Sequence, residues 1–188
     1  MKFESGGYLP VGLIRIYGAP VFVHWSALAA CAAILVAGYR EPIYATLFAV
    51  SYFGVILLHE FGHALVATKY GCRVFCVKMT ILHGVCEYET PWSERTDLVI
   101  AWGGVLAQLA VAIPLIFISV IFGMQDLGYL RPVVVFLGFI SVAFALINLA
   151  PSPYLDGYKA WKLIPMLTSD LFSRNKNKKK KVKMKVVK

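Results

Sequence analysis

Charged side chains are scarce in this sequence of 188 residues: Asp, Glu, Lys and Arg make up 15% of it, whereas 59% of the residues are hydrophobic. Soluble domains usually contain about 25% charged residues. This deficit excludes an intrinsically disordered chain, a nucleic-acid-binding module and an ordinary cytosolic enzyme. Because so many apolar side chains need a solvent that accepts them, the composition indicates a protein of the lipid bilayer.

Four stretches lack charge almost entirely, namely residues 16–39, 43–68, 98–125 and 132–155, and Glu60 is the one charged residue within them. About 20 apolar residues are enough to cross a hydrocarbon layer of about 30 Å. We therefore expect an all-α polytopic membrane protein with about four transmembrane helices. Residues 158–172 are too short and too polar for a fifth crossing, and they predict a helix lying at the membrane interface.

The excess of basic residues, which gives a net charge of +9, is concentrated at the C-terminus. The last fifteen residues contain nine of the 19 Lys and Arg residues and no acid. This pattern predicts a single domain over residues 1–172 and a disordered Lys-rich tail over residues 173–188.

Of the other basic residues, eight fall on the side of the two termini, and only Arg40 and Arg131 fall on the opposite side. Because Lys and Arg favour the cytoplasmic side, both termini are expected to be cytoplasmic.

The segment between the second and third apolar stretches has the alternation of β-structure. Residues 73–82 alternate β-branched, aromatic and polar side chains, and a second short run follows Gly84 over residues 85–90. This pattern predicts a small β-hairpin near the membrane surface, on the cytoplasmic side. The alternative is an irregular loop.

Three ionisable side chains interrupt the second apolar stretch: His59, Glu60 and His63. Positions i and i+4 share a face of a helix, so the two imidazoles can bind one metal ion. Glu60 lies about 100° around the helix from His59, where it can reach a water at that metal without being a ligand. The alternative is a pair of structural histidines beside a protonated glutamate. The cost of placing three polar groups in a membrane disfavours it.

A catalytic zinc ion takes three protein ligands and keeps one position open, so one ligand must come from another helix. The fourth apolar stretch supplies Asp156 at its C-terminal end, at the same expected depth as the histidines. Pro151 and Pro153 should unwind the chain just before it. Irregular backbone at membrane depth is tolerated where it lines a watery cavity. The alternative for Asp156 is an interfacial carboxylate paired with Lys159.

The His-Glu-x-x-His motif, followed about ninety residues later by Asn-x-x-Pro-x-Pro-x-Leu-Asp-Gly (residues 148–157), resembles the site-2 protease family of intramembrane zinc metalloproteases. Residues 18–28 are similar to the family's entry into its first helix. Residues 104–108 resemble the family's Gly-Pro-Leu-Ala-Asn, with Val105 in place of Pro and Gln108 in place of Asn. The resemblance covers roughly residues 15–160 and implies a minimal member without PDZ or CBS domains.

The resemblance implies one zinc ion per chain, held by His59, His63 and Asp156, with Glu60 as general base. It implies hydrolysis of peptide bonds in or near the transmembrane segments of membrane-protein substrates. Asn148 is a candidate donor to the substrate backbone or to the developing oxyanion, or else it forms a hydrogen bond between helices. The predicted hairpin is a candidate to receive the unwound substrate as an added strand.

Two other classes of function compete with proteolysis: a non-catalytic relative that binds zinc or client helices, and a small transporter. Glu60 disfavours the first, because a binding protein needs no base, and the absence of paired repeats disfavours the second.

Cys72, Cys76, His83 and Cys86 offer a second, weaker metal cluster. We expect His24 and His83 to be structural, and we expect the thiols to be reduced on the cytosolic side.

Overall fold

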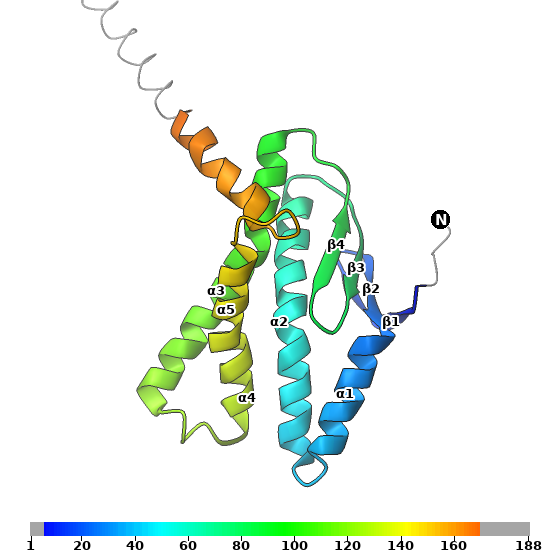
Figure 1. Ribbon diagram of the computed structural model, residues 1–188, viewed down its shortest axis with the longest axis vertical. Helices are drawn as coiled ribbons and strands as arrows, with labels where there is room; N and C mark the ends of the chain where they lie inside the picture. The colour runs from blue at the N-terminus through cyan, green and yellow to red at the C-terminus, as the bar shows by residue number, and fades with distance from the viewer. Residues whose placement is uncertain (1–5, 170–188) are drawn as a thin grey trace, which may run out of the picture.

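The computed structural model describes residues 6–169, in which three long helical stretches stand beside a small β-sheet (Figure 1). Along the chain the elements are β1 (Tyr8–Ile16), β2 (Ala19–His24), α1 (Trp25–Ala37), α2 (Pro42–Lys69), β3 (Val74–Met79), β4 (Gly84–Tyr88), α3 (Glu94–Phe122), the 3-10 turn η1 (Gly128–Leu130), α4 (Arg131–Val133), the π-helix η2 (Val134–Ile140) and α5 (Ser141–Asn148). A further helix occupies residues 157–169. The predicted interfacial helix coincides with this helix as far as residue 169, and the predicted tail over residues 173–188 lies outside the described residues.

The sheet has four strands in the order β1-β2-β3-β4. β1 pairs antiparallel with β2, β2 runs parallel to β3, and β3 and β4 form an antiparallel hairpin. The sequence predicted only a β-hairpin between the second and third helices of an all-α protein, which corresponds to β3 and β4; the pair β1 and β2 was not predicted. This pair turns at Tyr17 and Gly18, whose φ angles of 50° and 81° are the positive values that a tight two-residue hairpin turn requires.

Within residues 6–169, three helical stretches are long and apolar enough to cross a membrane, rather than the four expected: Pro42–Lys69, Glu94–Phe122 and Gly128–Asn148. The first predicted span, residues 16–39, is wrong as a single helix because β2 occupies its beginning. What remains helical there is α1, with 13 residues. At 1.5 Å per residue this helix covers about 20 Å, which is less than the hydrocarbon thickness.

Helix α2 lies at the centre of the molecule, with the sheet and α1 on one side and α3 and the α4–α5 stretch on the other (Figure 1). Helices α2 and α3 approach each other closely at Gly62 and Gly103. A Cβ atom added to Gly103 would lie 2.5 Å from the Gly62 carbonyl oxygen. Small residues at such a crossing let two backbones pack directly against each other. This contact sets the distance between the polar side chains of α2 and those of α3.

The last membrane-length stretch ends at Asn148, three residues before Pro151. This end confirms the expectation that the prolines unwind the chain. Residues 149–156 form an irregular segment, and Gly157 packs directly on the carbonyl oxygens of Leu149 and Ala150.

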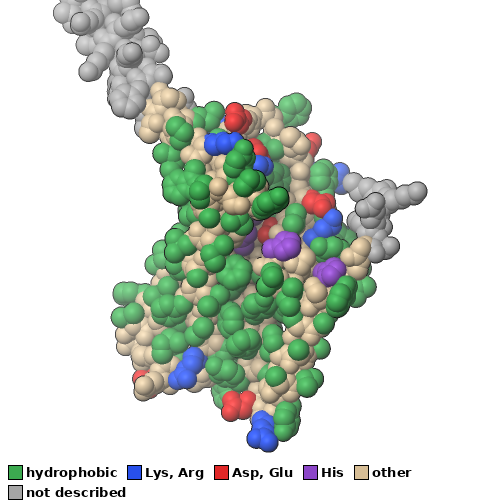
Figure 2. All heavy atoms as spheres, viewed as in Figure 1, with side chains coloured by type: hydrophobic (Ala, Val, Ile, Leu, Met, Phe, Trp, Pro, Cys, Tyr) green, Lys and Arg blue, Asp and Glu red, His purple; other side chains and the backbone are tan. Residues whose placement is uncertain are grey.

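In Figure 2, charged side chains gather over the upper part and at the lower end of the visible face, with a mostly apolar band between them. The long apolar helices and this surface describe an integral membrane protein.

Candidate metal centre

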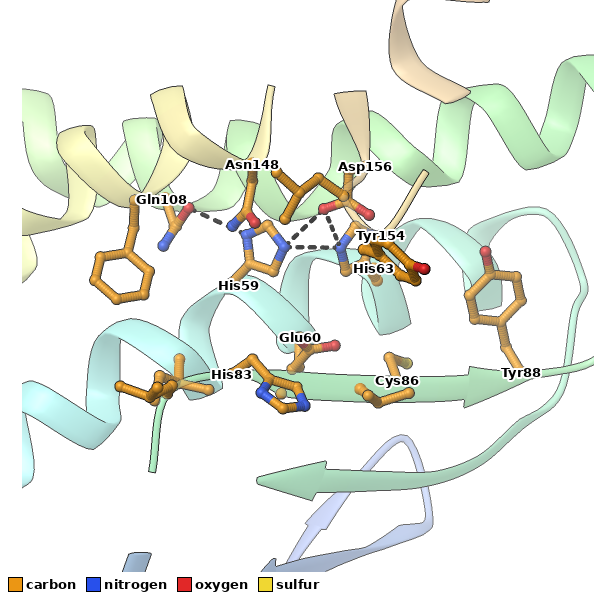
Figure 3. A pocket seen from close by; sticks show the side chains of 16 residues that line it. His59, Glu60, His63, His83, Cys86, Tyr88, Gln108, Asn148, Tyr154 and Asp156 are labelled. Atoms are coloured by element: carbon orange, nitrogen blue, oxygen red, sulfur yellow. Dashed lines mark hydrogen bonds and ion pairs between the residues drawn. The ribbon is translucent and has the colours of Figure 1, made fainter. Parts of the chain in front are cut away.

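The side chains of His59, His63 and Asp156 converge on one another (Figure 3). The histidines lie one turn apart on α2, and their Nε2 atoms are 3.0 Å from each other. Asp156 comes from the irregular segment after α5, and its Oδ2 lies 2.8 Å from His59 Nε2 and 3.1 Å from His63 Nε2. Both imidazoles are buried. The structure therefore brings together the three predicted metal ligands from two separate parts of the chain.

The second nitrogen of each imidazole fixes which nitrogen carries the proton. His63 Nδ1 lies 2.9 Å from the Ile100 carbonyl oxygen, which can only accept, so Nδ1 donates. His59 Nδ1 lies 3.1 Å from Gln108 Oε1. Gln108 Nε2 is turned toward the Val55 carbonyl oxygen at 3.4 Å, which supports this orientation of the amide. In the neutral rings, both Nε2 atoms therefore present lone pairs to the centre.

The group fits a small cation better than it fits a set of hydrogen bonds. Two imidazole lone pairs and a carboxylate oxygen meet within about 3 Å, and neutral rings leave no proton to share among them. Ligands of one tetrahedral zinc ion lie about 3.3 Å apart when each bond is about 2.0 Å long. The observed separations of 2.8, 3.0 and 3.1 Å are close to this value. Two imidazoles and a carboxylate are donors that suit zinc.

Helix α3 shapes the centre through glycine as well as through Gln108. A Cβ atom added to Gly104 would lie 2.5 Å from His59 Cε1, so only glycine leaves room for the imidazole at this position. Gln108 lies one turn further along the same helix and is fully buried. Hydrogen bonds to the outer nitrogens of metal-binding histidines orient the rings and raise their basicity. Gly104 and Gln108 together determine where the His59 ring stands.

The segment that carries Asp156 is tied down by two indoles. Trp161 Nε1 donates to the Leu149 carbonyl oxygen at 2.6 Å, and Trp102 Nε1 on α3 donates to the Ala160 carbonyl oxygen at 2.9 Å. The alternative in which Asp156 merely pairs with Lys159 is wrong. The Lys159 ammonium instead lies 2.8 Å from Asp97 Oδ2.

A cavity of about 690 Å³ opens beside the three ligands. Glu60, which is only 4% exposed, lies between the imidazoles and β4 (Figure 3). Gly84 packs on the Glu60 side chain, and the backbone of Cys86 hydrogen-bonds its carboxylate. Asn148 lines the opposite wall, at the end of α5. The cavity thus contains every residue that the sequence singled out for catalysis.

The second predicted cluster does not form. Among residues 6–169, His59, His63 and Asp156 are the one group of three whose ligand atoms converge. Cys86 pairs with Val77, the residue next to Cys76, and Cys76 pairs with Glu87. Because successive residues of a strand point to opposite faces, the two thiols project from opposite faces of the hairpin. Burial raises the pKa of the Cys76 thiol to about 11 and that of Cys86 to about 12, with nearby carboxylates adding to both shifts.

The two remaining histidines have local structural partners. His24 caps the N-terminus of α1 by accepting a hydrogen bond from the Ser26 backbone N–H at 3.2 Å. His83 lies in the β3–β4 turn, where its Nδ1 is 3.2 Å from Thr80 Oγ1.

The contact between His59 and Gln108, in contrast, was not predicted. The Gly103-Gly104 pair, which lies five and four residues before Gln108, is the local signal that could have indicated it.

Comparison with known proteins finds no matching family model. A curated zinc metalloprotease of Methanocaldococcus jannaschii is 25% identical over 155 residues, which cover 82% of this chain and 45% of the relative. A Synechocystis protein that is provisionally named a zinc metalloprotease is 29% identical over 123 residues, covering 60% of this chain and 29% of the relative. The chain therefore spans less than half the length of the curated relatives it matches.

The fold has a counterpart among solved structures. The site-2 protease from Methanocaldococcus jannaschii matches with a TM-score of 0.63 and 23% identity, over 84% of this chain and 71% of that one. This likeness shows that the chain has a site-2 protease fold. With the curated relatives, it confirms the resemblance to the site-2 protease family that the two motifs indicate.

Proposed function

We propose that this membrane protein is a zinc metalloprotease that hydrolyses peptide bonds in or near the transmembrane segments of other membrane proteins. One observation carries the proposal: three ligand atoms from α2 and the Asp156 segment meet beside a buried glutamate in one cavity. The curated metalloprotease relatives support the same reaction class. Placing ionisable side chains inside a membrane costs free energy, so such residues usually have a function, and a hydrolytic centre supplies one for this set.

In this proposal His59, His63 and Asp156 hold one zinc ion. When bound, zinc polarises the scissile carbonyl and makes water a stronger acid. Glu60 takes the proton from the attacking water and passes it to the leaving amine. Burial beside Gly84 keeps Glu60 away from bulk solvent, so the proton is transferred within the cavity. Asn148, from the opposite wall, donates to the substrate backbone or to the developing oxyanion.

The scissile segment of the substrate has to be extended, because a carbonyl inside a helix is already hydrogen-bonded. Residues 84–86 and Tyr88 of β4 line the cavity. β4 forms one edge of the sheet. We therefore propose that the extended substrate pairs, as an added strand, with the outer edge of β4. N-methylation of alternate substrate amides should raise KM at least tenfold at one register and little at the other. Equal effects at both registers would exclude strand addition.

The proposed orientation places both termini and the opening of the site toward the cytoplasm. Figure 1 shows the α1–α2 turn and the α3–α4 connection at one end of the molecule, away from the Asp156 segment. Arg40 lies in the first of these connections, and Arg131 begins α4 directly after the second; they are the two basic residues assigned to the non-cytoplasmic side. Cysteine labelling with an impermeant reagent in vesicles, after a cysteine is introduced at Glu41, tests this orientation.

The decisive experiment measures zinc and cleavage on the same detergent-purified protein. Cleavage is assayed with a panel of single-span substrates. Glu60→Gln should keep zinc and abolish cutting, whereas Asp156→Ala should lose affinity for zinc. Glu41→Gln, at the exposed start of the same helix, serves as the matched control and should cut normally. Zinc binding without cleavage of any substrate would instead identify a binding protein, and solute uptake without proteolysis would identify a transporter.

A further inference from the structure

The carboxylate of Asp97 joins two walls of the candidate site. Its Oδ1 accepts a hydrogen bond from the hydroxyl of Tyr88, at the end of β4, at 3.2 Å. Its Oδ2 lies 2.8 Å from the Lys159 ammonium. Asp97 itself belongs to the first turn of α3. Three elements that are distant in the sequence therefore meet at a single side chain.

The contact with Lys159 leads directly to the metal ligand Asp156. The Lys159 and Ala160 backbone N–H groups donate to the Asp156 carbonyl oxygen at 2.9 and 2.7 Å, so Asp156 starts the helix over residues 157–169. The ion pair to Asp97 anchors the first turn of this helix on α3. Trp102 anchors the same turn through its bond to the Ala160 carbonyl oxygen. A shift of this turn would move the Asp156 carboxylate relative to the imidazoles.

The contact with Tyr88 leads to the strand beside Glu60. Tyr88 and Cys86 both line the cavity, and the Cys86 backbone hydrogen-bonds Glu60. The Tyr88 hydroxyl bond therefore fixes the C-terminal end of β4 against α3. Since β4 is the edge strand that lines the cavity, this bond sets the position of that edge relative to the centre.

We propose that Asp97 is a positioning residue that holds Asp156 in the metal centre and holds β4 at the edge of the cavity. This inference rests on the proposed function, because it gives Asp97 a role toward zinc and toward an extended peptide. The side chains of Lys159 and Asp97 are 48% and 28% exposed. Ion pairs with this much exposure contribute little to folding stability. The pair should therefore affect the metal centre more than the unfolding temperature.

Three variants separate the two contacts, and the readouts are zinc affinity by chelator competition and KM against kcat for a cleaved peptide. Asp97→Asn and Lys159→Met should weaken zinc binding about tenfold, because the helix turn that follows Asp156 loses its anchor on α3 and site geometry is sensitive to shifts of about 1 Å. Tyr88→Phe should raise KM several-fold and leave zinc affinity unchanged. Glu94→Gln, which removes the other acid from the first turn of α3, is the matched control and should change neither.

A zinc affinity of Asp97→Asn within twofold of that of Glu94→Gln would overturn the inference. An equal loss of zinc affinity in Tyr88→Phe and Lys159→Met would overturn it as well, because the two contacts would then not be separate. If Asp97→Asn does not fold, Lys159→Met and Tyr88→Phe decide the outcome. If the wild-type protein binds zinc but cuts no peptide, the proposed function fails, while the zinc comparison still decides the role of Asp97.

Discussion

Gln108 Oε1 on α3 lies 3.1 Å from His59 Nδ1 on α2. The amide is fully buried, and its Nε2 faces the Val55 carbonyl oxygen on α2. An amide that both accepts from the ring and donates to the backbone of the neighbouring helix has one stable orientation. The His59 ring therefore has its proton on Nδ1 and its lone pair directed at Asp156 and His63.

Removing this amide should weaken the metal centre. In Gln108→Ala the His59 Nδ1–H would lose its partner inside the protein, at a cost of about 1–3 kcal/mol. We expect zinc affinity to fall by about 10- to 100-fold. Chelator competition measures this loss, and Gln125→Ala, at an exposed position after α3, is the control. An unchanged zinc affinity would show that the amide does not orient the ring.

Gly104→Ala should displace the imidazole without changing the fold. The added Cβ would lie 2.5 Å from His59 Cε1, closer than real contacts allow. We expect zinc affinity and peptide cleavage to fall at least tenfold, because catalytic geometry is sensitive to shifts of about 1 Å. Gly54→Ala is the control, since its Cβ would make an ordinary contact of 3.5 Å with Leu137. Equal behaviour of the two variants would contradict the steric argument.

The metal ligands could be predicted because their chemistry is local in the sequence. His59 and His63 show helical spacing in an apolar stretch, and Pro151 and Pro153 mark where the chain unwinds before Asp156. The structure brings these three ligands together. The role of Asp97 could not be predicted in this way. Its partners Tyr88 and Lys159 are brought to it only by the tertiary packing of three elements.

The first apolar stretch was misjudged because low charge does not distinguish a helix from a pair of strands. Residues 8–24 contain few charges, but Tyr17-Gly18 separates two mainly apolar runs that contain β-branched and aromatic residues. That turn signal predicts a hairpin, and the structure has one there. Length alone gave a fourth span, whereas turn chemistry would have divided the stretch at Gly18.

Metal removal should lower thermal stability, because the three ligand atoms of the apo protein would face one another with no cation between them. A ligand present at a hundred times its dissociation constant stabilises the folded state by about 2.7 kcal/mol. For a chain of this size that corresponds to a change in unfolding temperature of about 5–10 °C. Scanning calorimetry after chelator treatment and after zinc addition measures the change. The unfolding temperature of His63→Ala should not respond to zinc. If zinc raised the unfolding temperature of His63→Ala as much as that of the wild type, the metal would bind elsewhere.

The Cys86 thiol should react slowly, because burial and the neighbouring carboxylates raise its pKa to about 12. The thiolate is the reactive form, and at pH 8 about one thiol in 10⁴ is ionised at such a pKa, against about a quarter for an ordinary cysteine. We expect alkylation by iodoacetamide, followed by mass spectrometry, to be at least 100-fold slower in the folded protein than in urea. The rate should rise about tenfold per pH unit from pH 7 to 9.5, without a plateau. Cys86→Ser assigns the signal, and a plateau below pH 9 would mean that the thiol is exposed and that the hairpin does not close against Glu60 as the structure has it.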